Sequence, residues 1–259
     1  MLTALARRRP VERTPLAGDT ITAIPHFPPP IRLCVEDPQS SRMAVEAQTN
    51  LFKVRLANTQ ERRSQASYLI QRRYAWRGYS VSDDVPPAPS RITIAAHAQD
   101  ATAGTVTVGL DSGEGLFVDG LYGDEADRLR SDGRRLAEFT KLAIEDNIHS
   151  KPLLAALFHI AFIYARRIHR ATDLLIEVNP RHDGFYRRML GFERIGKMRS
   201  DPRIGAAAVL LRLCLERAEA EIGRLGGNPN VASIERSLYP YAFADREAVL
   251  IEQRLRALG

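Results

Sequence analysis

The stretch that decides the fold is residues 174–196, LLIEVNPRHDGFYRRMLGFERIG. Its apolar run 174–178 predicts a buried strand, which Asn179 and Pro180 bring to an end. Residues 183–190 predict a short helix, because Gly191 can adopt the positive φ that terminates one. This helix places Tyr186 near the end of the preceding strand.

The flanking segments complete an α/β pattern. Residues 136–144 predict a strand, and 152–170 predict a helix that Ser150 caps. A helix that links two strands makes them a parallel pair with a right-handed crossover. Residues 206–215 predict one more apolar strand.

The rest of the chain extends this pattern. Strands are predicted at 51–56, 91–97 and 105–110, and helices at 60–77 and 124–130. We therefore expect an α/β protein with a mixed sheet flanked by helices. The expected domains are an extended, proline-rich N-terminal arm (1–45), a catalytic domain (46–225) and a helical C-terminal extension (226–259). Regular structure is expected to begin near Leu51, and the last helix to run from about Ser233 to Leu258.

Two motifs resemble known families. Residues 174–196 resemble the second half of the Gcn5-related N-acetyltransferase fold, in which a strand–Asn–helix–Tyr–x–x–(Met/Leu)–Gly–Phe pattern is common. Residues 133–143, GRRLAEFTKLA, resemble the Glu-x-(Ser/Thr)-Arg-(Leu/Phe)-Ala segment of homoserine-lactone autoinducer synthases. The span 51–200 is most similar to the related long-chain N-acyl amino acid synthases. This resemblance implies transfer of a long acyl chain to the α-amine of an amino acid.

The loop 145–151, EDNIHSK, bears on the acyl donor. Acetyl-coenzyme A enzymes of this fold carry a glycine-rich turn here, whose N–H groups hold the pyrophosphate. A glycine-free loop with two carboxylates suits a donor without a nucleotide, namely acyl carrier protein with its phosphopantetheine arm. No bound cofactor is expected. An acetyl-coenzyme A-dependent N-acetyltransferase and a non-catalytic module for an acidic partner stay open as alternatives.

Amide formation from a thioester needs a base for the ammonium and donors for the oxyanion. Glu138 is the candidate base, since its apolar strand would raise its pKa, and the resemblance assigns this role to the same glutamate. Thr140 shares its face of the strand and can bond the substrate. Tyr186 is the candidate acid for the departing thiol. The alternatives are an arginine-paired structural glutamate and a tyrosine that only packs.

An amino acid acceptor also presents a carboxylate, which arginine donors bind well. Arg73 and Arg77, at the end of the first helix, are the candidates, although they can equally be solvated residues of a helix C-terminus. Lys141, which stands where autoinducer synthases have arginine, and Asn179 are further candidate substrate-binding residues in the two motifs.

Carrier protein is acidic, so its docking surface should be basic. The candidates follow two helices: Arg166, Arg167 and Arg170, and then Arg187 and Arg188. The first three can equally complement a helix dipole.

Composition sets the outer limits. The chain has 259 residues, a net charge of +6 and two cysteines, which cannot form a disulfide framework. The histidines form no metal-site spacing, and no nucleic-acid-binding motif is present. With no apolar run long enough to span a membrane and no secretory signal, we expect a cytoplasmic protein that contacts membranes through its lipid product at most.

Overall fold

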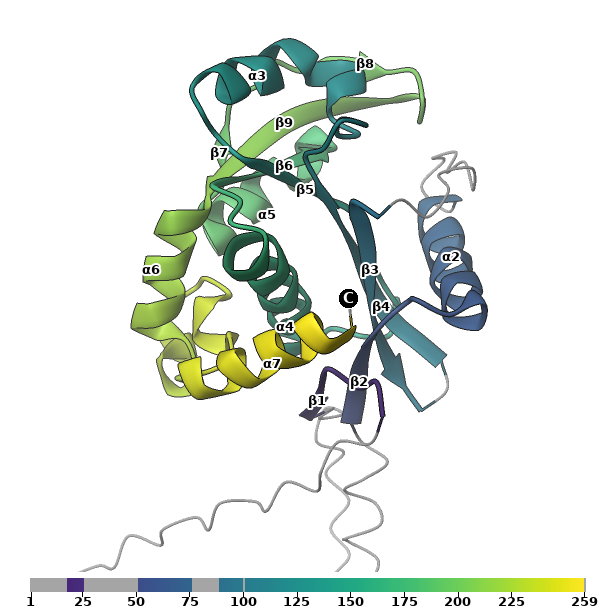
Figure 1. Cartoon of the computed structure of the whole chain (residues 1–259), viewed down its shortest axis with the longest axis vertical. Helices are drawn as coiled ribbons and strands as arrows, with labels where there is room; N and C mark the ends of the chain where they lie inside the picture. The colour runs from purple at the N-terminus through teal and green to yellow at the C-terminus, as the bar shows by residue number, and fades with distance from the viewer. Residues whose placement is uncertain (1–17, 26–50, 76–88, 100, 259) are drawn as a thin grey trace, which may run out of the picture.

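The structure is a computed structural model that describes residues 18–25, 51–75, 89–99 and 101–258 (Figure 1). The strands are β1 (Thr22–Pro25), β2 (Leu51–Leu56), β3 (Arg91–Ala98), β4 (Ala101–Leu110), β5 (Leu136–Ile144), β6 (Asp173–Val178), β7 (Glu193–Arg194), β8 (Arg199–Asp201) and β9 (Ala206–Cys214). The helices are α2 (Gln60–Ala75), α3 (Asp119–Ser131), α4 (Lys151–Phe162), α5 (Pro180–Leu190), α6 (Leu215–Leu225) and α7 (Asp245–Leu258), with a π-helical segment η1 (Ile163–Ile168) and 3-10 turns η2 (Pro229–Ser233) and η3 (Tyr239–Tyr241).

One mixed sheet organises these elements. Its strand order is β1-β2-β3-β4-β5-β6-β9-β7, and β8 pairs with β9. Every pair is antiparallel except β5 with β6, which are parallel and are connected through α4. The predicted mixed α/β sheet with a helical crossover between these two strands is therefore confirmed.

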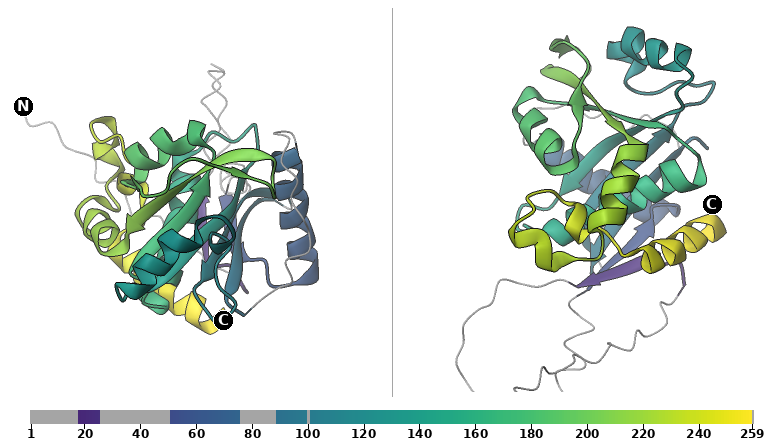
Figure 2. Two further views of the ribbon diagram at one scale, coloured as in Figure 1. Left: turned by 90° about the horizontal axis from the view of Figure 1, so that it is seen from above. Right: turned by 90° about the vertical axis from the view of Figure 1, so that its left-hand side faces the viewer.

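Helices cover both faces of the sheet. Helix α2 packs on β4 and β5, whereas α4 packs on the opposite side of β3 and β4 (Figure 1). We call these the α2/α3 face and the α4 face. The C-terminal helix α7 lies beside the first strand (Figure 2), where Arg254 Nη1 donates hydrogen bonds of 3.1 Å to the carbonyls of Thr20 and Ile21.

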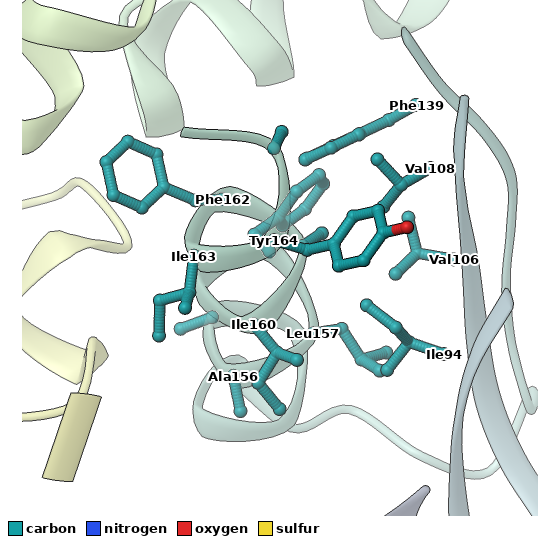
Figure 3. Packing of buried hydrophobic residues seen from close by; sticks show 14 of the residues in the cluster. Ile94, Val106, Val108, Phe139, Ala156, Leu157, Ile160, Phe162, Ile163 and Tyr164 are labelled. Carbon is teal, nitrogen blue, oxygen red and sulfur yellow. The ribbon is translucent and has the colours of Figure 1, made fainter. Parts of the chain in front are cut away.

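The main core lies between α4 and the sheet (Figure 3). Val106 and Val108 of β4 and Phe139 of β5 face Leu157 and Ile160 of α4, and all five are buried. A smaller core on the other face joins α3 to Leu136, Leu175 and Leu210. Odd and even positions of β5 and β6 thus point into different cores, which fixes the face on which every polar side chain of these strands lies.

The local signals around the decisive stretch act as expected. Asn179 Oδ1 accepts a hydrogen bond from the N–H of Arg181 and caps α5, and Gly191 ends the helix with φ of 76°. Ser150 Oγ likewise accepts a hydrogen bond from the N–H of Leu153 at the start of α4. These caps fix where each helix begins relative to the strand it follows.

Two expectations about the periphery are wrong, and one helix is not predicted from the sequence. Regular structure does not begin near Leu51, because β1 precedes it and adds an edge strand to β2. The segment 215–225 forms α6 directly after β9. The chain after Ser233 is not one helix: it passes through η3, and α7 begins at Asp245. Pro25 ends β1 at the sheet edge, where a residue without an N–H is tolerated.

Candidate active site

The candidate site lies where β5 and β6 diverge. The two strands pair over three positions, from Leu136 with Asp173 to Glu138 with Leu175. Beyond this point β5 continues along β4 and β6 continues along β9 (Figure 1). The backbone groups that β5 and β6 turn toward each other past Glu138 are therefore not used in the sheet ladder. A substrate held between the strands can be contacted from both faces of the sheet.

Glu138 lies on the α2/α3 face and is 1% exposed. Its Oε1 accepts a hydrogen bond of 2.9 Å from the N–H of Phe117, and its Oε2 accepts one of 3.1 Å from the N–H of Val118. Burial raises the pKa of Glu138, and the two N–H groups and Arg91 act against this. Both oxygens of the predicted base therefore hold the backbone just before α3.

The register of β4 and β5 places Thr140 opposite Thr107 and Glu138 opposite Gly109. Thr140 therefore lies on the α2/α3 face, as Glu138 does. A β-bulge follows at once. Lys141 has φ of 52°, and its carbonyl accepts a hydrogen bond of 3.0 Å from Thr105 Oγ1. Bulges redirect side chains and increase local twist. This one turns the end of β5 away from β6 beside the point where they part.

A second carboxylate lies close by on β6. Glu177 is on the α2/α3 face, two positions beyond Leu175, where β6 has left β5. Its Oε2 accepts a hydrogen bond of 2.6 Å from Arg203 Nη2, and its Oε1 is buried with no hydrogen-bond partner among the described residues. Burial raises the pKa of Glu177 to about 7, with Asp201 and Glu138 contributing and Arg203 opposing.

Arg203 contacts several groups around Glu177. It donates hydrogen bonds of 2.8 Å from Nε to Asp201 and from Nη1 to the carbonyl of Phe117, and its guanidinium lies 3.9 Å from the centre of the Phe117 ring. The segment before α3 is thus held from two sides, by Glu138 through its N–H groups and by Arg203 through a carbonyl. Sequence reasoning missed both Glu177 and Arg203.

Arg91 is a further residue that sequence reasoning missed. It begins β3, its side chain is 25% exposed, and its Nε lies 4.0 Å from Glu138 Oε1. No signal in the sequence separates it from the many other arginines. Its importance follows from the β3–β4–β5 pairing, which brings it beside Glu138 across Gly109.

Tyr186 lies on the opposite side, in an aromatic cluster of the α4 face. Its ring is edge-on to Phe158 at 6.3 Å and to Phe192 at 5.8 Å between centroids, and Phe158 stacks on Phe139 at 6.1 Å. These rings come from β5, α4, α5 and the turn after α5. The structure therefore places Tyr186 and Glu138 on different faces of the sheet.

A buried apolar cavity of about 30 Å³ adjoins this aromatic cluster. It is lined by Phe139, Phe158, Leu174, Phe192, Leu213 and Ile222, among others. That volume holds one or two water-sized groups, far less than an alkyl chain. Any long acyl chain that enters here must displace the aromatic rings or the helices that carry them.

Two ion pairs join the loop that follows β5 to helix α2. Glu145 pairs with Arg72, and Asp146 pairs with Arg73, both from α2. Arg73, the predicted carboxylate clamp, is thus engaged with the loop that in acetyl-coenzyme A enzymes holds a pyrophosphate. Arg77, the other predicted clamp residue, lies outside the described residues.

The predicted docking arginines fall into two groups. Arg166 donates a hydrogen bond of 3.0 Å to Glu219 of α6, and Arg167 pairs with Asp245 of α7, so both tie η1 to the C-terminal helices. Arg170 is exposed at the end of this segment with φ of 60°. Arg187 and Arg188 instead line a surface groove of about 430 Å³, together with Arg217 and Glu193.

Comparisons with known proteins identify the family. A family model described as "N-acyl amino acid synthase FeeM" matches residues 65–214. The solved structure of FeeM, an N-acyl amino acid synthase from uncultured soil microbes, is 26% identical, with a TM-score of 0.60 over 65% of this chain and 94% of that one. A putative N-acetyltransferase from Lactobacillus plantarum (15% identity, TM-score 0.48, 63% and 98% covered) and the homoserine-lactone synthase LasI (14%, 0.44, 63% and 90%) are also similar. No curated protein matches.

The fold and the family match define an acyltransferase that acts on nitrogen, built on the Gcn5-related N-acetyltransferase fold. The chain belongs to the FeeM family of N-acyl amino acid synthases, whose model covers more than half of its length. None of the helices in the described ranges is long and apolar enough to cross a membrane.

Proposed function

We propose that this protein transfers a long acyl chain from acyl carrier protein to the α-amine of an amino acid, with the thioester held where β5 and β6 part. The observation that carries the proposal is this divergence, which lies between buried carboxylates on one face and aromatic rings on the other. The family match supplies the reaction class.

The choice of carrier protein over coenzyme A rests on the loop 145–151. A nucleotide pyrophosphate is held by unused backbone N–H groups and is repelled by carboxylates. Here the loop has no glycine, and its two carboxylates pair with Arg72 and Arg73. A phosphopantetheine arm on a protein makes no such demand, because the carrier itself supplies the remaining contacts.

For carrier docking we propose the groove that Arg187, Arg188 and Arg217 line. It lies on α5, the helix that also carries Tyr186, so a carrier bound there would present its arm beside the aromatic cluster. Arg166, Arg167 and Arg170 form a secondary part of this proposal, since two of them also tie η1 to the C-terminal helices.

The acceptor is proposed to bind on the α2/α3 face, with its amine toward the thioester. Arg91 and the predicted residues Arg73, Arg77 and Lys141 are candidates for its carboxylate, and Arg91 is the one that lies beside a site carboxylate. Asn179 caps α5, so any substrate contact it makes is additional to this role.

The chemistry follows from these positions. The acceptor nitrogen attacks the thioester carbon, backbone N–H groups of β5 beyond its pairing with β6 stabilise the oxyanion, and the thiolate leaves on the side of Tyr186. Thr140 can bond the attacking amine. Because a thiolate is a good leaving group, removal of the Tyr186 hydroxyl should cost less than about tenfold in kcat, against roughly 10²- to 10⁴-fold for the loss of a general base.

The test is to incubate the purified protein with a mixture of amino acids and one acyl donor at a time, and to identify products by mass spectrometry. Donors are short and long acyl chains, each on carrier protein and on coenzyme A. We expect N-acyl amino acids from the long-chain carrier donors. Equal turnover of acetyl-coenzyme A would support the acetyltransferase alternative, and the absence of any amide would contradict enzymatic acyl transfer.

A further inference from the structure

We propose that Glu177 of β6, and not Glu138, is the general base that takes the proton from the acceptor ammonium. This proposal rests on the acyl transfer proposed above. It starts from two buried carboxylates on the same face of neighbouring strands, whose surroundings differ in a way that decides which of them can accept a proton.

Glu138 is committed to the backbone. Each of its oxygens accepts one N–H, from Phe117 and from Val118, at 2.9 and 3.1 Å. Burial raises the pKa of Glu138, whereas these hydrogen bonds to the charged form of its carboxylate oppose its protonation. A proton on one oxygen of Glu138 would make that oxygen a weaker acceptor and so weaken one of these two hydrogen bonds.

The two oxygens of the Glu177 carboxylate differ in their hydrogen bonds. Arg203 donates to Oε2, whereas Oε1 has no partner in the part of the chain that the structure describes. Protonation of Oε1 therefore breaks no existing hydrogen bond. Because Asp201 shares Arg203, the guanidinium stays paired when Glu177 becomes neutral.

The titratable and charged groups around Glu177 come from three elements. Arg203 and Asp201 belong to β8 and the turn after it, Glu138 belongs to β5, and Tyr122 belongs to α3. Two carboxylates oppose one guanidinium here, which favours a proton on this cluster near neutral pH and supports the geometric argument.

Glu177 also has the right place on its strand. Leu175 is the last residue of β6 that pairs with β5, and Glu177 is the next residue on the α2/α3 face. It therefore stands at the first position of this face where the strand is free of β5. Its side chain as a whole is 9% exposed, against 1% for Glu138, whereas its unpartnered Oε1 is itself buried.

The step balances as follows. The Glu177 carboxylate takes one proton from the ammonium, and the neutral amine attacks the thioester carbon. As the C–N bond forms and the C–S bond breaks, the nitrogen loses a second proton, which the thiolate takes up. Glu177 then releases its proton to solvent, so that thioester and ammonium give amide, thiol and one proton.

The experiment compares the wild type with Glu177→Gln and Glu138→Gln, using an amino acid and then hydroxylamine as nucleophile, with long-chain acyl carrier protein as donor. Hydroxylamine is neutral at pH 7 and needs no base. We expect Glu177→Gln to lose roughly 10²- to 10⁴-fold in kcat with the amino acid but to stay close to the wild type with hydroxylamine.

The pH profile provides a second readout. The rise of kcat/KM around pH 7 should disappear in Glu177→Gln and persist in Glu177→Asp, which keeps a carboxylate. Asp173→Asn is the matched control, because Asp173 is a fully buried, arginine-paired carboxylate at the paired end of the same strand. It should lower the melting temperature and leave the pH profile unchanged.

Each outcome decides the matter. Glu177 is not the base if Glu177→Gln keeps the wild-type rate with amino acids. It is also not the base if the rise of kcat/KM around pH 7 disappears only in Glu138→Gln. If both nucleophiles fail equally in a folded Glu177→Gln, its role is structural and the proposal is overturned. If the wild type forms no amide at all, the proposed function itself falls.

Discussion

Glu138 owes its place to a missing side chain on the neighbouring strand. A Cβ built on Gly109 would lie 2.8 Å from Glu138 Cγ and from Oε1, closer than such atoms can approach. The glycine thus leaves the space in which the carboxylate reaches the N–H groups of Phe117 and Val118. A glycine usually weakens the interior of a strand, but Gly109 allows the buried carboxylate of Glu138 to bind the backbone just before α3.

Gly109→Ala should therefore destabilise the protein by about 1–3 kcal/mol, the usual cost of overpacking, and should displace Glu138. Urea unfolding measures this. Gly113→Ala is the control, since nothing lies within 4 Å of a Cβ at that position. Equal stability of the two variants would show that Glu138 does not need the space.

The raised pKa of Glu177 has a consequence for stability that does not depend on activity. Its pKa is about 7 in the folded protein and has an ordinary value of 4.5, so the folded state binds this proton more tightly. This contribution is fully present below pH 4.5 and is lost as the pH rises to 7.

The free energy of unfolding of the wild type, relative to Glu177→Gln, should accordingly fall by on the order of 3 kcal/mol between pH 4.5 and 7.5. Urea titrations of both proteins across this range give the difference. The buried histidines titrate in both proteins and cancel. A difference that does not change with pH would mean that the pKa of Glu177 is ordinary.

At the scale of the elements, α5 and η1 carry arginines of different character. Arg187 and Arg188 line the basic groove, whereas Arg166 and Arg167 join η1 to α6 and α7. The double variant Arg187→Glu/Arg188→Glu should raise KM for acyl carrier protein about tenfold or more and flatten its salt dependence, because opposite charges promote encounter.

The matched control is Arg246→Glu, an exposed arginine on α7. It should leave KM for the carrier unchanged. If the control and the double variant behave alike, the carrier does not dock in the groove.

Patterns within single elements were sufficient to predict most of the sheet and α4, because alternation, caps and Gly191 act locally. The signals for α6 were also present, since Leu215, Ala218, Ile222 and Leu225 follow helical spacing, but the apolar strand before them obscures the boundary. β1 could not be predicted from its own composition, because it exists through pairing with β2.

The contacts between the side chains of the site could not be predicted from local patterns either. The sequence indicates that Glu138 lies in an apolar strand, but not which groups meet its oxygens. Arg203 reaches Glu177 from 26 positions away and Phe117 from 86 positions away. These contacts depend on how β8, β9 and α3 pack, and no local pattern encodes them.

At the scale of the whole molecule, the small cavity limits which acyl chains fit without rearrangement. A cavity of about 30 Å³ is too small for a long chain, so the proposed long-chain donor would have to open the aromatic cluster of Phe139, Phe158, Tyr186 and Phe192. In the proposed function, this opening takes place beside the point where β5 and β6 part.

The most direct measurement is mass spectrometry of lipids extracted from cells that express the wild type, Glu177→Gln or no protein. We predict new long-chain N-acyl amino acids in the wild-type extract and their loss in the variant. Extracts that contain no new N-acyl amino acid, from cells in which the wild type is folded and abundant, would contradict it.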